Sequence, residues 1–492
     1  MTCSEVTLTQ DASPRHTVNK IGGTSMSETD AVLNNILIGN RTGDEYYNRI
    51  FVVSAYGGMT DLLLENKKTN EPGVYALYAG SENDWTWNEA LSAVNETMRG
   101  LNRRILEDTA DIEIADRFVE DRIEGIRSCL LDLQRLCSFG HFQLEEHLLS
   151  VREMLSGVGE AHSAHNTMLL LRRKGVNAVF VDLSGWRETN TKPLDDRITD
   201  AFSSIDLTRE LPIVTGYAQC REGLVGLYGR GYSEVTFSRI ACLTNAEEAI
   251  IHKEFHLSSA DPKIVGTDQV RTIGQTNYDV ADQLSNMGME AIHPRAAKGM
   301  RQMGIPLRIM NTFEPDHKGT IISEDWQSDE AKAEIVTGIP TAYEIEVFDQ
   351  DMVGIPETAE KVTRAFSRFK VWTVARNTNA NTLTHYVTAP LKQVRRIVAA
   401  LQEDLPSAGI RTRKVCLVSV IGSNLGTPHM FAKAVSALSD AGLDLLAAQQ
   451  PSRKVDMQFI LPEAAFNGAI STLHEALVES PPQKATSRKK AA

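Results

Sequence analysis

The chain is 492 residues long, 42% of its residues are hydrophobic, and its formal net charge is −13. This length and apolar content are enough for two to four domains, each with its own core. The acidic balance argues against nucleic acid as the main partner, and no apolar stretch approaches the ~20 residues that a membrane-spanning helix needs. We therefore expect a cytoplasmic protein without nucleic-acid or membrane partners.

The first predicted elements are a strand, a glycine turn and a helix. Residues 17–25 read as a short strand that ends in two adjacent glycines. A helix is expected from Met26 to Gly39, with Thr24 or Ser25 as its cap.

This turn has the outline of a phosphate site. Gly22 and Gly23 let backbone N–H groups approach an anion closely, and the helix that follows adds its positive dipole end. Lys20 supplies a full positive charge beside them. The Gly-Lys-Ser/Thr of a Walker loop is missing, so a plain strand-to-helix connection is the alternative interpretation.

A second strand and glycine turn follow. The apolar residues 50–53 predict a buried strand, Gly57 and Gly58 a tight turn, and Thr60 with Asp61 the start of another helix. Two successive strand–glycine–helix units are typical of a parallel α/β sheet, whose ligands gather at the carboxyl ends of the strands.

The next segment is predicted to be a helical insertion or cap. Residues 88–155 contain no proline and place Leu, Glu and Arg at helical spacing. A new helix is expected to begin at residues 157–160, followed by a strand over residues 178–183. Glu160 would then lie in the first helical turn, where simple compensation of the helix dipole is one alternative role.

A third strand, residues 211–217, leads to a further glycine turn. Gly229 and Gly231 flank Arg230 there, and a helix from Ser233 and Glu234 is expected to end near residue 243. An arginine in such a turn could clamp a carboxylate with two hydrogen bonds, which a lysine would do less well. An exposed arginine in a hairpin is the alternative.

Further alternating strands and helices are predicted after this helix. Residues 249–265 predict a strand, a polar loop and a turn at Asp261-Pro262. A helix, a break at His293, a second helix and a strand over residues 307–310 follow. His293 is expected to be structural and to fix the start of the second helix through its ring.

The sequence shows no sign of a metal site held by side chains or of disulfides. The six cysteines are scattered without CxxC spacing, so buried reduced thiols are expected. His162 and His165 are too close for i, i+4 metal ligation, and packing or surface roles are expected for them. We assign no residue to metal binding.

Taken in order, these segments resemble the amino-acid kinase superfamily and, within it, the aspartate kinases. The resemblance covers residues 17–325 and continues into the C-terminal third. Seven segments carry it in register: Lys20 to Ser25 against K-F-G-G-T-S, Val53 to Ala55 with Thr60 and Asp61 against V-S-A and T-D/N, Gly159-Glu160, Gly229 to Glu234 against G-R-G-G-S-D, Ala260 to Lys263 against A-D-P-R, His293 to Arg295, and Asn311 to Phe313.

The resemblance implies a three-layer α/β/α sandwich that phosphorylates the side-chain carboxylate of L-aspartate with ATP and Mg²⁺. It implies that Lys20 and Glu234 are catalytic, and that the side chains of Thr60, Glu160, Arg230 and Ser233 bind the substrate. Glu160 would hold the α-ammonium and Arg230 the α-carboxylate. The implied nucleotide-binding residues are Gly22, Gly23, Thr24, Gly229, Gly231, Asp261 and Lys263.

The sequence departs from the family pattern at several of these positions. Glu234 replaces an aspartate, which shifts the charge by one methylene, and Tyr232 replaces a glycine. Residues 252–259 lack the Asp pair and Tyr of the family's T-D-V-D-G-V-Y-T loop. Glu290 stands where relatives often have a lysine. The last two departures fall on the nucleotide side of the site that the resemblance implies.

The C-terminal third contains an internal repeat of βαββ units about 70 residues apart. Both copies resemble ACT modules, ferredoxin-like (βαββαβ) domains that pair and bind amino acids. We place them at residues 340–410 and 411–480, with residues 420–428, Gln449 and Gln450 facing an effector. The alternative is that one or both copies only dimerise the protein.

These expectations define a domain scheme and a function. A disordered arm over 1–15 precedes a catalytic domain over 16–325, and a disordered tail over 481–492 ends the chain. The resemblance implies an ATP-dependent aspartate kinase that makes 4-phospho-L-aspartate, regulated by the ACT pair and at least dimeric. It further resembles the specialised aspartate kinases of ectoine-producing bacteria. A kinase for another acidic amino acid such as glutamate, or a catalytically impaired amino-acid sensor, are the alternatives.

Overall fold

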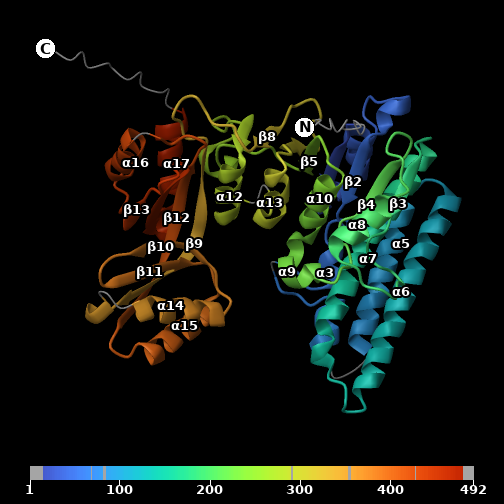
Figure 1. Cartoon of the computed structure of the whole chain (residues 1–492), viewed down its shortest axis with the longest axis horizontal. Helices are drawn as coiled ribbons and strands as arrows, with labels where there is room; N and C mark the ends of the chain where they lie inside the picture. The colour runs from blue at the N-terminus through green and yellow to red at the C-terminus, as the bar shows by residue number, and fades with distance from the viewer. Residues whose placement is uncertain are drawn as a thin grey trace, which may run out of the picture. The chain divides into compact units, whose positions relative to one another are not determined.

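The computed structural model describes residues 15–67, 69–80, 85–289, 292–352, 356–426 and 428–479. These residues form two compact units (Figure 1), one with the chain up to His256 and His293–Ser323, the other with Leu257–Ile292 and the chain from Glu324 on. Except for Arg15, the predicted disordered arm and tail lie outside the described residues. Among the helices described here, none has the length and apolar character for crossing a membrane.

The first unit is built on a twisted sheet with the strand order β3-β4-β2-β1-β5-β7-β8. Neighbouring strands are parallel, except that β8 runs antiparallel to β7. Its strands are β1 Thr17–Ile21, β2 Arg49–Val53, β3 Ala178–Val181, β4 Leu211–Thr215, β5 Glu248–Lys253, β7 Leu307–Asn311 and β8 Thr320–Ser323. The central strands β2 and β4 are buried along their whole length, as expected for a parallel sheet covered on both faces.

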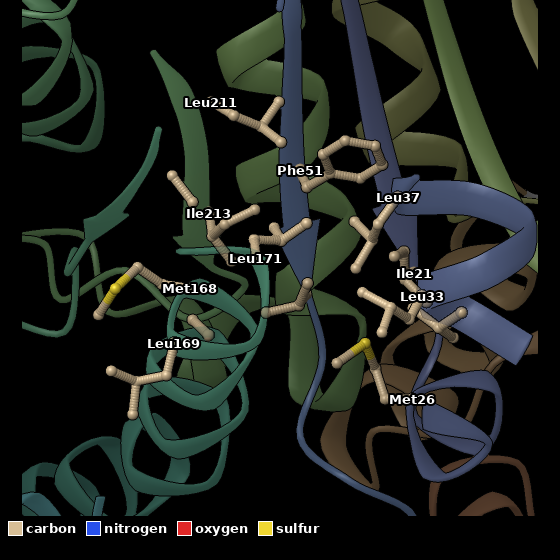
Figure 2. Close-up of a cluster of buried hydrophobic side chains, with 14 of the residues drawn as sticks. Ile21, Met26, Leu33, Leu37, Phe51, Met168, Leu169, Leu171, Leu211 and Ile213 are labelled. Atoms are coloured by element: carbon tan, nitrogen blue, oxygen red, sulfur yellow. The ribbon is translucent and has the colours of Figure 1, made fainter. Parts of the chain in front are cut away.

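Helices cover both faces of this sheet. Figure 2 shows one face, where Ile21 and Phe51 from the central strands pack with Met26 and with Leu171 of the long helix α7, Leu148–Arg173. Because side chains alternate along a strand, Lys20 points to the other face, and α10, Tyr232–Leu243, packs there against β1. The predicted three-layer α/β/α sandwich is confirmed.

The predicted helix over residues 26–39 is wrong as a single element. The chain instead forms α1, Gly23–Ser27, then α2, Thr29–Ala31, and a π-helical turn, Val32–Leu37. The backbone at Glu28 leaves the helical region, and the cap position before α1 is Gly22, without a side-chain cap. The Ser25 hydroxyl, expected as a cap, donates to Glu254 Oε1 at 3.2 Å.

The predicted helix start at residues 157–160 is also wrong, because α7 runs straight through them. Both glycines there are needed for close packing. A Cβ on Gly159 would lie 2.8 Å from Ala55 Cβ, and a Cβ on Gly157 would lie 2.8 Å from Tyr217 Cδ1. The close approach of α7 to the segments that follow β2 and β4 therefore offsets the low helix propensity of glycine. Glu160 consequently lies in the helix interior, which excludes the dipole-compensation role.

Long helices make up the predicted helical segment. α5, Trp85–Ile105, and α6, Thr109–Cys137, pack with α7, and the three helices run side by side in Figure 1. His162 is fully buried between them, and its Nε2 lies 2.7 Å from Asn102 Oδ1. Burial lowers the pKa of His162 to about 3, so the ring is neutral and its predicted packing role is confirmed. The remaining helices of this unit are α3 Met59–Leu63, α4 Val74–Gly80, α8 Leu194–Phe202, α9 Leu224–Tyr228 and α13 Pro294–Gln302.

The second unit contains an antiparallel sheet with the order β10-β11-β9-β12-β14-β13. Along the chain the elements follow strand–helix–strand–strand–helix twice, which confirms the predicted ferredoxin-like repeat. They are β9 Ile335–Phe348, α14 Pro356–Arg368, β10 Thr373–Thr378, β11 Thr382–Val387, α15 Leu391–Asp404, β12 Gly409–Ile421, α16 Pro428–Asp440, β13 Ala447–Gln449, β14 Asp456–Pro462 and α17 Phe466–His474.

The two modules share their long strands. The C-terminal half of β9, with Ile345 and Val347, belongs to a core with α14 and α15. Its N-terminal half, with Val336, belongs to a second core with α16 and α17. Because β12 pairs with β9 along its length, each of these strands completes both modules. The predicted starts of the two modules, residues 340 and 411, therefore lie inside β9 and β12.

The segment before the modules packs in the same unit. It contains α11 Pro262–Val265, β6 Gln275–Asn277 and α12 Tyr278–Asn286. Ala260 lies in the core with Val336, and the Thr276 hydroxyl donates to the buried Glu334 carboxylate at 2.9 Å.

Substituting two helix-interior glycines should separate close packing from helix propensity. Gly159→Ala should lower the stability of the folded chain by about 1–3 kcal/mol, because the added methyl overlaps Ala55. Gly100→Ala in α5, where a Cβ meets nothing within 4 Å, should raise stability by about 0.5–1 kcal/mol. Urea unfolding followed by circular dichroism measures both. Equal stability of the two variants would contradict the packing role of Gly159.

Candidate active site

A buried ion pair lies at the carboxyl end of β1. The Lys20 side chain is almost fully buried, and its Nζ lies 3.5 Å from Oε1 of Glu234 in the first turn of α10. β1 carries Lys20 on the face that α10 covers, so strand alternation and the helix start together set this contact. The structure therefore brings the two predicted catalytic residues together.

Glu234 is held in its ionised form. Burial alone would raise its pKa, but the charges of Lys20 and Lys253 and the backbone N–H of His293 outweigh burial and lower the pKa below its usual value. That N–H donates to Glu234 Oε2 at 2.6 Å. The longer side chain of glutamate thus still reaches the lysine. His293 also caps α13, with Nδ1 accepting the N–H of Arg295 at 3.3 Å, so its predicted structural role is confirmed.

Glu160 is a buried carboxylate in the opposite condition. It accepts a hydrogen bond from the backbone N–H of Tyr217, and burial raises its pKa well above the usual value, although Lys20 partly opposes that shift. Its Oε2 has no hydrogen-bond partner among the described residues. A buried carboxylate oxygen without a donor is costly, so Glu160 is suited to receive a cationic group.

Gly216, which sequence reasoning missed, allows Glu160 and Ser233 to meet at the end of β4. A Cβ at Gly216 would lie 2.9 Å from Glu160 Oε2, 2.7 Å from Ser233 Cβ and 2.9 Å from the backbone oxygen of Val53. Only glycine leaves space at this point. Its sequence signal was weak, because it directly follows a strand in the manner of an ordinary turn residue.

The first glycine turn contains one tight and one open position. A Cβ on Gly23 would lie 2.8 Å from the backbone oxygen of Ala55, whereas a Cβ on Gly22 would make only ordinary contacts, the nearest at 3.7 Å from the His252 oxygen. Gly22 therefore leaves space at the mouth of the turn. Thr24 is exposed beside it, and Thr60 is half-buried in the first turn of α3.

Glu153 of α7 was also missed, and it supports the glycine turn Gly229–Gly231. Its Oε1 accepts the backbone N–H groups of Val225, at 2.7 Å, and Gly226, at 3.1 Å. Its Oε2 accepts the Tyr217 hydroxyl at 2.8 Å. α9 begins at these N–H groups and leads directly into the turn Gly229–Gly231. Glu153 therefore joins that turn to the Tyr217 that contacts Glu160.

Arg230 lies in the turn Gly229–Gly231, and Tyr232 directly follows it at the start of α10. The backbone of Arg230 forms the middle of the short turn, and its side chain lies outside the described residues. Tyr232 fills the position of the family's glycine and packs its ring edge-on against Tyr217, with ring centroids 5.6 Å apart. Glu290 is outside the described residues.

Asp261 and Lys263 are the predicted site residues that lie outside the first unit. Both belong to the second unit and are exposed there. Asp261 caps α11, with Oδ1 accepting the N–H of Lys263 at 2.9 Å. In the part of the chain that the structure describes, no group of three or more His, Cys, Asp or Glu side chains could hold a metal ion.

Comparison with known proteins identifies the family. Residues 15–311 match the model of the amino acid kinase family. Aspartate kinase Ask_Ect of Stutzerimonas stutzeri is 48% identical over 464 residues, which cover 94% of this chain and 98% of that relative. The aspartokinase of Geobacillus stearothermophilus is 26% identical over 342 residues, 66% of this chain and 81% of its own.

A solved structure shares the fold at lower identity. Aspartokinase III of E. coli, in complex with lysine and aspartate, gives a TM-score of 0.71 at 16% identity, over 94% of this chain and 99% of its own. The family match and the high identity over nearly the whole of Ask_Ect identify the same family as the motifs that contain Lys20 and Glu234. These two residues form the ion pair at the end of β1. The chain therefore belongs to the amino acid kinase family, and within that family it is an aspartate kinase.

Proposed function

We propose that Lys20 stabilises the phosphoryl group during its transfer from ATP to the side-chain carboxylate of L-aspartate. The observation that carries the proposal is the buried Lys20–Glu234 pair, 3.5 Å apart, beside an open glycine turn. A carboxylate is already a nucleophile, so the reaction needs in-line placement and charge neutralisation rather than a general base. Glu234 orients the ammonium group of Lys20, and this intact pair favours a working kinase over an impaired sensor.

In the proposal, Glu160 and Arg230 bind the α-amino and α-carboxylate groups of aspartate. Glu160 Oε2 has no donor among the described residues, and the substrate ammonium would supply one. Arg230, in the turn that Glu153 supports, would grip the carboxylate with two hydrogen bonds. Ser233 and Thr60 would orient the substrate through their hydroxyl groups.

The glycine turns at Gly22-Gly23 and at Gly229–Gly231 would hold the nucleotide phosphates. Gly22, Gly23 and Thr24 offer backbone N–H groups at the end of β1, and Gly229 with Gly231 offers a second set. Mg²⁺ would bind mainly to the phosphate oxygens, as is usual for this ion. Glu254, whose Oε1 lies 4.0 Å from the position of a Gly22 Cβ, fits the role of a single carboxylate ligand. Asp261 and Lys263 remain proposed nucleotide contacts.

The C-terminal modules are proposed to regulate the enzyme and to join it into a homodimer. Aspartokinase III of E. coli has been crystallised with lysine and shares the fold, and effectors of this kind typically couple to a catalytic site by about 1–3 kcal/mol. The predicted effector side chains Gln449 and Gln450 lie near the start of β14 and the loop before α16. Gln449 Nε2 donates to Gln458 Oε1 at 2.6 Å, and Gln450 Nε2 donates to the Leu425 oxygen at 3.4 Å. The enzyme is further proposed to be cytoplasmic and to be of the ectoine-associated type.

Replacing Lys20 should abolish most of the chemistry. Lys20→Ala should lower kcat by about 10²–10³-fold, because charge stabilisation in the transition state is lost. Hydroxylamine trapping of the acyl phosphate, with ATP, Mg²⁺ and L-aspartate, measures the rate. Lys67→Ala, at an exposed lysine, is the matched control. Near-normal hydroxamate formation by a folded Lys20→Ala protein would refute the proposed role.

The raised pKa of Glu160 predicts a pH dependence specific to aspartate. As the pH falls through this raised pKa, the carboxylate gains a proton and loses its attraction for the substrate ammonium, so kcat/KM for aspartate should fall. Glu160→Gln should raise the KM for aspartate by about 10–100-fold and remove this pH dependence. Steady-state kinetics across the pH range, with kcat/KM for ATP as the internal reference, test it. An unchanged pH profile in Glu160→Gln would reject the assignment.

Glu153 is expected to act as a positioning residue. Glu153→Gln keeps the shape but leaves one acceptor oxygen for the Tyr217 hydroxyl and two backbone N–H groups. The KM for aspartate should rise by about tenfold, the effect of one charge-assisted hydrogen bond, while the KM for ATP changes little. Tyr217→Phe should give a smaller increase. A parallel rise in both KM values, or loss of kcat alone, would argue for a merely structural role.

A further inference from the structure

The second unit contains a chain of buried hydrogen bonds that the catalytic proposal does not use. The Ser259 hydroxyl lies 2.9 Å from Nε2 of His474, and Nδ1 of the same ring lies 2.7 Å from Oε1 of Glu479. Serine, histidine and glutamate in this order are the groups of a hydrolase triad. Ser259 and His474 are almost fully buried, however, so the hydroxyl is closed to a substrate. The chain of hydrogen bonds therefore serves to connect parts of the protein.

The direction of each hydrogen bond follows from the groups at the two ends. Because the carboxylate of Glu479 can only accept, Nδ1 of His474 carries the proton, and Nε2 is left to accept the Ser259 hydroxyl. Ser259 Oγ in turn accepts the backbone N–H of Arg271 at 3.0 Å. Both nitrogens of the ring are thus used by a single tautomer, and the serine oxygen donates and accepts at once.

The serine end of this chain belongs to the loop that carries the proposed nucleotide contacts Asp261 and Lys263. The backbone of Ser259 is held on both sides. Its N–H donates to the Arg271 oxygen at 2.9 Å, and its oxygen accepts the N–H of Val336 in β9 at 2.8 Å. The loop is therefore anchored two residues before Asp261.

The histidine end belongs to the second ferredoxin-like module. His474 is the last residue of α17, and Glu479 lies in the π-helical turn that follows. α17 also packs against α11, the short helix that Asp261 caps, and the Ser471 hydroxyl of α17 donates to the Ile264 oxygen of α11 at 3.5 Å. The module thus holds the loop both before and after Asp261.

We propose that His474 is a positioning residue for ATP, which holds the loop over residues 257–263 so that Asp261 and Lys263 meet the nucleotide. The inference rests on the nucleotide contacts proposed above. A lysine binds phosphate as a point charge at the end of a flexible side chain, so its contribution depends on where the backbone places it. The second module would then contribute to the affinity for ATP even when no effector is bound.

Steady-state kinetics of single variants test this role. His474→Leu removes both hydrogen bonds of the ring and should raise the KM for ATP by about three- to tenfold, the effect of one buried hydrogen bond. The values of kcat and of the KM for aspartate should change little. His474→Gln keeps an acceptor near the position of Nε2 and should restore most of the affinity for ATP. Ser259→Ala, a smaller change at the other end of the contact, should give the same increase as His474→Leu.

A matched control separates positioning from a general loss of stability. Ile470→Val removes one buried methyl group from the core that α17 shares with Ala260, and such a change costs about as much stability as a lost hydrogen bond. It touches none of the hydrogen bonds described above, so the KM for ATP should stay unchanged. Circular dichroism and thermal unfolding establish that each variant is folded.

A double variant tests whether His474 acts through the loop. Lys263→Ala alone should raise the KM for ATP, and adding His474→Leu should raise it by less than the product of the two separate effects, because the positioned side chain is gone. In His474→Leu, hydrogen exchange of the backbone amides of residues 257–263 should also be faster than in the intact chain.

The inference is overturned if the KM for ATP is unchanged in folded His474→Leu and Ser259→Ala proteins, or rises equally in Ile470→Val. Fully independent effects in the double variant, or a parallel rise in the KM for aspartate, would overturn it too. Failure of the proposed nucleotide contacts is recognised separately, as an unchanged KM for ATP in Lys263→Ala and Asp261→Ala. A raised KM in these two variants with normal histidine variants would leave the contacts standing and reject only the role of His474.

Discussion

The Lys20–Glu234 pair is the constraint on which the first unit depends. Two charges removed from water are expensive unless each is neutralised and hydrogen-bonded. Here β1 supplies the cation and α10 the anion, while Lys253 and the N–H of His293 add support to the carboxylate. Strands β1 and β5 and helices α10 and α13 must therefore meet within a few ångströms. The glutamate that replaces the family aspartate still makes this contact.

The pKa values of two buried carboxyl groups, Glu234 and Glu160, are shifted in opposite directions. Glu234 is surrounded by positive charge and a backbone donor, and its pKa is lowered. Glu160 has one backbone donor and an oxygen without a partner among the described residues, and its pKa is raised. Such divergent environments separate the tasks of acidic groups in a site. One carboxylate belongs to the protein's own ion pair, and the other keeps the unpartnered oxygen that its proposed role in binding the substrate ammonium requires.

The sequence predicted those features that depend on neighbours along the chain. The strands before each glycine turn, the helix from Ser233 onward and the capping role of His293 follow from local patterns of apolar residues, glycine and proline. The motifs in register then identified Lys20 and Glu234, which the structure brings into contact. The predicted substrate and nucleotide roles of the other residues stay predictions.

Features that depend on distant packing could not be read in the same way. Gly157 and Gly159 resembled a helix start, because their reason, the approach of Tyr217 and Ala55, lies elsewhere in the sequence. Gly216 and Glu153 went unnoticed for the same cause: their partners come from other strands and helices. Asp261 matched a motif, but its carboxylate serves as a helix cap in the structure.

The two C-terminal modules share two long strands and therefore form one continuous structural unit. β9 and β12 pass through both cores, so a displacement in one module is transmitted along a continuous backbone ladder rather than across a flexible linker. Separating the modules in the course of evolution would require cutting two paired strands and exposing new sheet edges, which are prone to aggregation. The pair is thus expected to be inherited, exchanged and lost only as a whole.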